Sequence, residues 1–422
     1  MNIVIKGKLK GCVTPPPSKS QAHRLLICAA LGRSVVRIFC DSLNDDLCAT
    51  MESLNALGAG ITYADGAFDI VPVSLRKGGV MPCGESGSTL RFLLPVAAAL
   101  GADATLTGKG KLPLRPMDTL FDALKEHGVE HEELSSDAHL PLVCRGRLTP
   151  GEYSLPGEIS SQYFTGLLFA LPLLDADSKI NVVGELTSAS YVGMTLDALR
   201  LSGIKIDKSD GGFAVPAPQE YRLPSQLRVE GDWSSAAFWL VAGVIGDALI
   251  SICGMNATSL QGDRRIIDHL LKMGAEIEIT DDAIIASPSK LHGAEIDCTD
   301  TPDLVPILSV AAAAAEGETL FTHVGRLRYK ESDRLEAMRT LLASFGICSV
   351  VGEDSFCVMG GRPVAMRPVD SFGDHRIAMS AAIMSTIADG ATTIDGAECV
   401  AKSYPGFYDD FTTLGGMTTT IE

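Results

Sequence analysis

A repeat of about 70 residues runs the length of this 422-residue chain and limits its possible folds more than any other sequence feature. Amphipathic segments with a leucine-rich face recur six times and end in glycine, the usual left-handed stop of a helix. Almost wholly apolar segments recur six times out of phase with them. Both series have intervals of 69 to 75 residues; the first ends at Gly58, Gly128, Gly203, Gly274, Gly346 and Gly415, and the second at Gly32, Gly101, Asp175, Gly246, Gly317 and Gly390.

The repeating unit has a definite order of elements. A short β-like stretch follows each apolar segment, and alternating stretches broken by a turn follow each amphipathic one. The pattern predicts a βαβαββ unit that occurs six times. An apolar helix must be buried and an amphipathic helix covers it or the sheet, so we expect an α/β protein with two domains of three units each. A solenoid of six stacked units is the alternative, but apolar helices that close a core suit it less well.

The two ends of the chain indicate a discontinuous domain. The last unit has only seven residues after Gly415, too few for its hairpin, while the N-terminal MNIVIKG is a strand without a unit of its own. We expect this strand to complete the last unit. The predicted domains are therefore 16–228 and, joined together, 1–15 and 229–422.

Composition excludes several classes of protein. A hydrophobic fraction of 46% is too high for a disordered chain. A formal net charge of −17 opposes a nucleic-acid surface, because binding to a phosphate backbone needs a basic face. The longest apolar run, 304–315, is too short to cross a membrane. We expect small-molecule partners and neither nucleic acid nor a membrane.

Cysteine usage and the N-terminus bear on location. The eleven cysteines are scattered singly without a CxxC pair, which is typical of reduced thiols. The start MNIVIK has neither the basic region nor the apolar core of a signal peptide. These features predict a cytoplasmic protein. His127 and His131 are spaced like metal ligands, but no third ligand is indicated, and we expect no metal site.

Cations near expected helix starts are the first sign of a binding site. Serine, threonine, aspartate and glycine open the apolar helices, as ordinary N-caps do. Lys19, Arg91 and Arg376 also lie there, although the helix dipole disfavours positive charge at an N-terminus. In so acidic a chain, cations at this end of a helix indicate a bound anion, which free N–H groups also favour.

Two further basic positions are less informative by themselves. Residues 326–334 hold a run of charges, and such a run is usually a solvated face. We expect Ser332 to cap the following helix and to leave Lys330 and Glu331 in the loop before it. Lys402 is a lone lysine in a predicted loop.

Together these segments resemble the 5-enolpyruvylshikimate-3-phosphate (EPSP) synthase family over essentially the full length. The motifs, in the family's order, are SKSQAHR, GESGSTLR, LRPMDTL, PGEISSQYFTGLL, SYVGMTL, VEGDWSSAAF, TPDL, RYKESDRL, GDHRIAMS and AKSYPGF. The resemblance implies an inside-out α/β barrel of two domains, each with three βαβαββ units, that close on their substrates.

The same resemblance implies a reaction. The family transfers the enolpyruvyl group of phosphoenolpyruvate to the 5-hydroxyl of shikimate 3-phosphate by addition and elimination, and releases phosphate. This is a step of the shikimate pathway towards chorismate and the aromatic amino acids. It uses no metal or organic cofactor, and a monomer is expected.

Site residues follow from the resemblance, motif by motif. It implies that 16–228 holds shikimate 3-phosphate and that 1–15 with 229–422 holds phosphoenolpyruvate. The implied catalytic residues are Asp303, Glu331 and Lys19. The implied contacts of shikimate 3-phosphate are Lys19, Ser20, Arg24, Ser160, Ser161, Gln162, Ser188, Tyr191, Asp303 and Lys330. Those of phosphoenolpyruvate are Lys19, Gly87, Arg115, Gln162, Arg334, Arg376 and Lys402.

Two positions depart from the family pattern and one bears on inhibition. Glu85 and Arg326 stand where the family usually has asparagine. An anion at 85 suits an anionic substrate only if it pairs with a cation such as Arg91 or Arg115. Gly87 retains the glycine that the resemblance links to sensitivity to glyphosate, because a side chain there would intrude on the inhibitor.

Three other functions remain as alternatives. UDP-N-acetylglucosamine enolpyruvyl transferase shares the fold but has a catalytic cysteine near the position of Arg115, where KGKLPLRPMDTL has none. A non-catalytic scaffold should have lost Lys19, Asp303 or Glu331, and all three are present. A relative of RNA-terminal phosphate cyclase should bind nucleic acid, which the net charge opposes.

Overall fold

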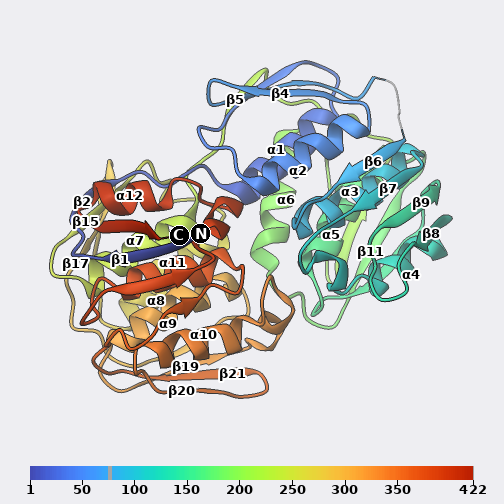
Figure 1. Cartoon of the computed structure of the whole chain (residues 1–422). Coiled ribbons are helices and arrows are strands. Elements are labelled where there is room, and N and C mark those ends of the chain that lie inside the picture. Colours follow the sequence, from blue (N-terminus) through green and yellow to red (C-terminus); the bar gives the residue numbers. More distant parts are fainter. Residues whose placement is uncertain (75–77, 422) are drawn as a thin grey trace. The chain divides into compact units, whose positions relative to one another are not determined.

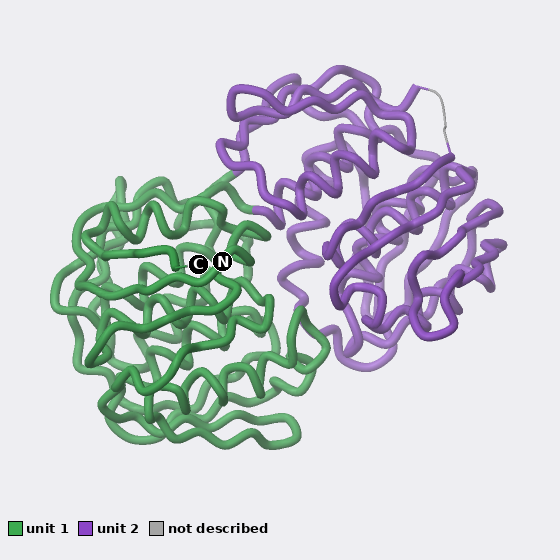
Figure 2. The backbone as a smooth tube through the Cα atoms, in the orientation of Figure 1, with its two compact units in different colours: residues 1–18, 230–422 green, residues 19–229 purple. Residues whose placement is uncertain are grey.

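The chain forms two compact units in a computed structural model that describes residues 1–74 and 78–421. Unit 1 consists of Met1–Ser18 and Glu230–Glu422, and unit 2 of Lys19–Val229 (Figure 2). The chain therefore leaves unit 1 after its first strands, builds unit 2, and returns. The boundaries expected from the sequence, at 15/16 and 228/229, lie within a few residues of these.

The described residues form six four-stranded sheets of one plan. The first two strands are parallel, and the third and fourth each add antiparallel. In unit 2 the orders are β14(Gln226–Arg228)-β3(Val36–Phe39)-β5(Ala67–Val71)-β4(Gly60–Ala64), β6(Gly79–Pro82)-β7(Ala104–Thr107)-β9(Leu142–Gly146)-β8(Val129–Glu133) and β10(Glu152–Pro156)-β11(Ser178–Val183)-β13(Gly212–Val215)-β12(Asp207–Ser209). In unit 1 they are β2(Gly11–Val13)-β15(Ile250–Cys253)-β17(Ala283–Ser287)-β16(Glu276–Ile279), β18(Glu295–Asp297)-β19(Glu318–Thr322)-β21(Ser355–Met359)-β20(Ser349–Val351) and β22(Val369–Asp370)-β23(Thr392–Asp395)-β1(Asn2–Lys6)-β24(Met417–Ile421).

The N-terminal strand completes the last sheet, as the sequence predicted. Strand β1 pairs antiparallel with β23 and with β24, and Asn2 lies opposite Ile421. The two ends of the chain therefore lie side by side in unit 1 (Figure 1).

The two segments that connect the units are also joined within unit 1. The N–H of Ser18 donates to the carbonyl of Glu230 at 2.7 Å, and the N–H of Asp232 donates to that of Pro16 at 2.8 Å. Strand β2, just before the first connecting segment, joins the sheet of β15. Strand β14, just before the second, joins the sheet of β3. Each of these two strands is thus the first strand of a sheet whose other strands lie elsewhere in the sequence.

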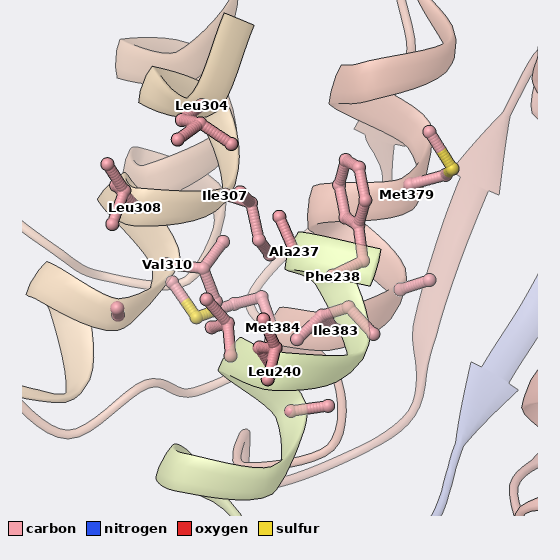
Figure 3. Close-up of a cluster of buried hydrophobic side chains, with 14 of the residues drawn as sticks. Ala237, Phe238, Leu240, Leu304, Ile307, Leu308, Val310, Met379, Ile383 and Met384 are labelled. Atoms are coloured by element: carbon pink, nitrogen blue, oxygen red, sulfur yellow. The ribbon is translucent and has the colours of Figure 1, made fainter. Parts of the chain in front are cut away.

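The apolar helices form the two cores. In unit 1, Phe238, Ile307 and Met379 come from three different helices and belong to one buried cluster (Figure 3). An equivalent cluster fills unit 2. These helices are α1 (Lys19–Ala30), α3 (Gly87–Leu100) and α5 (Ser161–Ala170) in unit 2, and α7 (Trp233–Ile245), α9 (Val305–Ala314) and α11 (His375–Met384) in unit 1.

The amphipathic helices cover the cores, each with one buried face. They are α2 (Asp45–Ala56), α4 (Asp118–Glu126), α6 (Ala189–Leu201), α8 (Ile266–Lys272), α10 (Arg334–Ser344) and α12 (Phe407–Thr413). The glycine after each of them has a positive φ, between 73° and 107°, which confirms the stops that the sequence predicted.

The structure corrects one expectation about the cysteines. Cys12 of β2 and Cys253 of β15 form a disulfide, and the other cysteines are free. Nothing in the spacing of the cysteines indicates this pair, because only the parallel pairing of β2 with β15 brings the two residues together. Among the helices that the structure describes, none is long and apolar enough to cross a membrane.

Candidate active site

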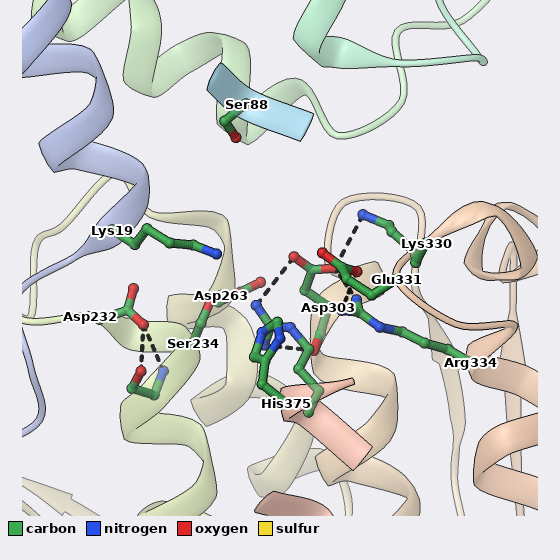
Figure 4. A network of polar contacts seen from close by, with 12 residues as sticks. Lys19, Ser88, Asp232, Ser234, Asp263, Asp303, Lys330, Glu331, Arg334 and His375 are labelled. Carbon is green, nitrogen blue, oxygen red and sulfur yellow. Dashed lines mark hydrogen bonds and ion pairs between the residues drawn. The ribbon is translucent and has the colours of Figure 1, made fainter. Parts of the chain in front are cut away.

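Asp303 is the centre of a charged cluster in unit 1. It lies in the 3-10 helix η4 (Pro302–Leu304), before the buried helix α9. Its carboxylate is 3.2 Å from Lys330 Nζ, 2.9 Å from Arg334 Nη1 and 3.2 Å from Arg376 Nη2 (Figure 4). Burial alone would raise the pKa of Asp303, but the attraction of Lys330, Arg376 and Arg334 holds it well below its usual value. Asp303 is therefore ionised at neutral pH.

Arg334 links this carboxylate to two others. Its Nη2 donates to Glu331 Oε2 at 2.7 Å and its Nε to Asp374 Oδ2 at 2.8 Å. The side chain is only 2% exposed. Burial opposes its positive charge, but Asp374, Glu331 and Asp303 outweigh that effect and raise the pKa of Arg334. Arg334 is thus a fixed cation around which the carboxylates are arranged.

The start of α10 differs from the sequence prediction. Asp333, not Ser332, caps the helix, because its Oδ1 accepts from the N–H groups of Leu335 and Glu336 at 3.2 Å each. The Ser332 hydroxyl donates to Asp374 Oδ2 at 3.0 Å instead. This loop places Lys330 and Glu331 before the helix, as expected, and fastens it to the start of α11.

Arg376 and Lys402 are the other two cations of the cluster around Asp303. Arg376 is the second residue of α11, where Asp374 caps the helix by accepting from the Arg376 N–H at 3.0 Å. Its Nη1 also donates to the Asp303 carbonyl at 3.1 Å. Lys402 ends the 3-10 helix η6 (Ala397–Lys402), and its Nζ lies 3.8 Å from Glu331 Oε1. Four cations thus lie around Asp303, Glu331 and Asp374, an arrangement suited to binding an anion.

Lys19 is held by a carboxylate that the sequence did not single out. It is the first residue of α1, and its Nζ donates to Asp46 Oδ2 at 2.8 Å. The Asp46 side chain is only 8% exposed. Asp46 belongs to the first turn of α2, where Asn44 is the N-cap. Acidic residues in a first helical turn are common, so its spacing along the chain carried no functional signal.

Arg24 joins α1 to α6. Its guanidinium donates to Thr195 Oγ1 at 2.9 Å and to the carbonyls of Ser20 and Tyr191 at 2.7 and 2.8 Å. Burial lowers the pKa of Arg24 to about 10. Ser188 lies just before α6 with a φ of 55° and is buried. Arg24 thus fixes the backbone on which Ser20 and Tyr191 stand.

Arg91 and Gln162 connect the starts of α3 and α5. Arg91 Nη1 donates to Gln162 Oε1 at 2.7 Å, and Gln162 Nε2 donates to Ser88 Oγ at 3.1 Å. Ser160 caps α5, its Oγ accepting from the Gln162 N–H at 3.3 Å. The helices approach closely at Gly166, where a Cβ would lie 2.3 Å from the Arg91 carbonyl oxygen. Gln162 is thus held at a helix start beside Ser161.

Gly87 and Arg115 are in contact at the start of α3. A Cβ added to Gly87 would lie 2.7 Å from Arg115 Nη1 and 3.1 Å from its Cζ. Arg115 follows the 3-10 helix η1 (Leu112–Leu114) and is 9% exposed. The missing side chain of Gly87 therefore leaves the space that the guanidinium occupies.

The two positions that depart from the family pattern have structural contacts. Glu85 lies against Gly110, where an added Cβ would be 1.8 Å from Glu85 Oε1. The guanidinium of Arg326 donates to the carbonyls of Cys298 and Thr299, before η4. Among the residues with described positions, no group of three or more histidine, cysteine or acidic side chains could hold a metal ion.

The fold is α/β, and the buried cations of unit 1 form a cluster suited to binding small anions. The model of the EPSP synthase family (3-phosphoshikimate 1-carboxyvinyltransferase) matches residues 3–411. The chain is 43% identical over 413 residues to the 3-phosphoshikimate 1-carboxyvinyltransferase of Clostridium kluyveri, with 97% of this chain and 96% of the relative covered. That of Clostridium acetobutylicum is 41% identical over 416 residues, with 97% and 96% covered. The chain belongs to the EPSP synthase family.

A solved structure supports the same fold. EPSP synthase from Acinetobacter baumannii is 26% identical, with a TM-score of 0.80, and the match covers 99% of this chain and 100% of that one. The expected two-domain α/β fold is therefore confirmed.

Proposed function

We propose that this protein transfers the enolpyruvyl group of phosphoenolpyruvate to the 5-hydroxyl of shikimate 3-phosphate and releases phosphate. The observation that carries the proposal is the contact of Asp303 with Lys330, Arg334 and Arg376, beside Glu331. Relatives more than 40% identical are named for this reaction. The product leads to chorismate and the aromatic amino acids.

The chemistry requires these residue types. In the addition, the 5-hydroxyl oxygen bonds to C2 of phosphoenolpyruvate, its proton passes to a base, and an acid protonates the C3 methylene. In the elimination, C3 loses a proton and phosphate leaves C2, which restores the double bond. Asp303, Glu331 and Lys19 are the proposed acids and bases, since carboxylates and a lysine can serve both steps.

The anionic groups of the substrates account for the cations. We assign phosphoenolpyruvate to Lys19, Gly87, Arg115, Gln162, Arg334, Arg376 and Lys402. Arginine suits this substrate because it binds phosphate and carboxylate with two hydrogen bonds. For shikimate 3-phosphate we retain Lys19, Ser20, Arg24, Ser160, Ser161, Gln162, Ser188, Tyr191, Asp303 and Lys330. Binding would exchange internal carboxylate partners for substrate anions.

Location and assembly stay proposals. We propose a cytoplasmic monomer that needs no nucleic acid or membrane. The nine free thiols support the cytoplasmic location, and the net charge of −17 opposes binding to nucleic acid.

Phosphate release tests the proposed function. We expect release from phosphoenolpyruvate only when shikimate 3-phosphate is present, measured by a coupled phosphate assay with the purified protein. UDP-N-acetylglucosamine is the control acceptor, and release that depends on it would favour the sister reaction. Release that needs neither acceptor would contradict the proposal.

Replacing Gly87 by alanine should weaken phosphoenolpyruvate binding and glyphosate inhibition. The added methyl group displaces the Arg115 guanidinium, because it would lie 2.7 Å from Nη1. Loss of a charge-assisted hydrogen bond costs about 1.5–3 kcal/mol, so we expect a rise of about 10- to 100-fold in the KM for phosphoenolpyruvate. Steady-state kinetics at saturating shikimate 3-phosphate measure it.

Glu85→Asn is the matched control for this region. It removes a charge two residues away without filling the space at Gly87. If native protein and Gly87→Ala respond alike to glyphosate while Glu85→Asn becomes far more sensitive, charge at position 85 governs the pocket, and the steric argument is wrong.

A further inference from the structure

Asp263 is a buried carboxyl group next to the cluster for which neither the sequence motifs nor the proposed mechanism has a use. It lies in the 3-10 helix η3 (Gly262–Arg265), between β15 and α8, and is 2% exposed. Its Oδ2 accepts a hydrogen bond from the hydroxyl of Ser234 in α7. In Figure 4, Asp263 lies between Ser234 and the Asp303 group.

The second oxygen of this carboxyl group is unusual. Asp263 Oδ1 is buried and has no hydrogen-bond partner among the residues that the structure describes. Buried carboxylate oxygens are normally hydrogen-bonded, because removal from water is otherwise costly. A purely structural anchor for Ser234 would need only one carboxyl oxygen and no charge.

The charges of groups on three other elements act on Asp263. They are Arg376 of α11, Asp303 of η4 and Asp232, the N-cap of α7. Burial raises the pKa of Asp263 to about 6; Arg376 and Ser234 pull it down, while Asp303 and Asp232 push it up. The carboxyl group thus changes charge near neutral pH, beside a cation of the anion-binding cluster.

We propose that Asp263 couples proton uptake to the binding of an anion at Arg376, so that protonated Asp263 gives the cluster its high-affinity form. An anion at Arg376 repels the carboxylate and offsets the positive charge that favours its ionised form. Binding therefore favours protonation of Oδ1, the free oxygen, and by reciprocity protonation tightens anion binding to the same extent. Identifying the anion with phosphoenolpyruvate rests on the proposed function; the coupling itself does not.

Sulfate is a suitable probe because it does not titrate between pH 5 and 9. Isothermal titration calorimetry of the whole protein, in two buffers of different ionisation enthalpy, gives both affinity and proton uptake. If an anion raises the pKa of Asp263 by one unit, about half a proton is taken up at pH 6.5, and affinity falls about sevenfold from pH 5.5 to 8.

Two variants separate coupling from structure. Asp263→Asn keeps an acceptor for Ser234 but cannot titrate, so this uptake should disappear and sulfate should bind about tenfold more tightly than to the native protein at pH 8. Ser234→Ala removes the hydrogen bond and keeps the carboxyl group, so proton uptake should persist. The comparison also subtracts any contribution from His375, which all three proteins share.

Several results would overturn the proposal. Equal proton uptake by native protein and Asp263→Asn would show that another group titrates. Absence of sulfate binding at every pH would show that the cluster does not bind this anion. Loss of affinity in Asp263→Asn at pH 8 would show that a neutral side chain at 263 does not favour the high-affinity form. The proposed function is tested separately, by turnover that requires shikimate 3-phosphate. If such turnover is observed together with any of these results, the proposed function stands and only the coupling is wrong.

Discussion

Asp303→Asn should lower turnover by about 100-fold or more, the usual cost of losing a general acid or base. Asparagine preserves the shape of the side chain but removes the charge that holds Lys330, Arg334 and Arg376 at 2.9 to 3.2 Å. Both the proton-transfer group and the order of the cations are lost together. Turnover at saturating phosphoenolpyruvate and shikimate 3-phosphate measures the effect.

Asp297→Asn is the matched control for Asp303. Asp297 is in the same unit, but its side chain is 64% exposed and pairs with His323. Turnover of this control should stay within about twofold of native, as for surface changes away from a site. A rate for Asp303→Asn within tenfold of native would show that Asp303 is neither acid nor base.

Glu331→Gln should also cut turnover by about 100-fold, while leaving the binding of shikimate 3-phosphate largely unchanged. Glu331 accepts from Arg334 at 2.7 Å and lies 3.8 Å from Lys402, so its carboxylate is held beside the proposed phosphoenolpyruvate cations. Glutamine can still accept from Arg334 but cannot transfer a proton. Turnover and calorimetric titration with shikimate 3-phosphate separate the two effects.

Glu336→Gln, in the first turn of α10 that follows the Glu331 loop, provides the comparison. Glu336 is 46% exposed and pairs with Arg339, and we expect near-native turnover. If Glu331→Gln loses shikimate 3-phosphate binding along with turnover, the residue supports the structure of the substrate site, and its role in proton transfer is wrong.

The clusters explain how an acidic protein can bind anions. A net charge of −17 repels small anions at long range. In unit 1, however, Arg334, Arg376 and Lys402 are less than a tenth exposed and lie close to one another. Their attraction acts in a poorly screened environment, so local charge outweighs the distant charge.

Much of the candidate site was visible in the sequence as types of residue near helix starts. The structure places Lys19, Gly87, Ser161 and Arg376 in the first two positions of α1, α3, α5 and α11. In the structure the cap of α10 is Asp333 and not Ser332, which we expected from the sequence. Serine and aspartate are about equally good caps, so the choice depended on Asp374, which takes the Ser332 hydroxyl.

The sequence by itself determined the helices, their glycine stops and the strand β1 that completes the last sheet. These signals are local, because hydrophobic spacing and backbone φ are set by residues within a few turns. Only the tertiary structure decided that β2 joins β15 while β14 joins β3. It alone paired Arg334 with Asp374, 40 residues away, and placed Asp263 beside the cluster. Such contacts arise where helix starts from different repeats pack together, and no spacing along one helix encodes them.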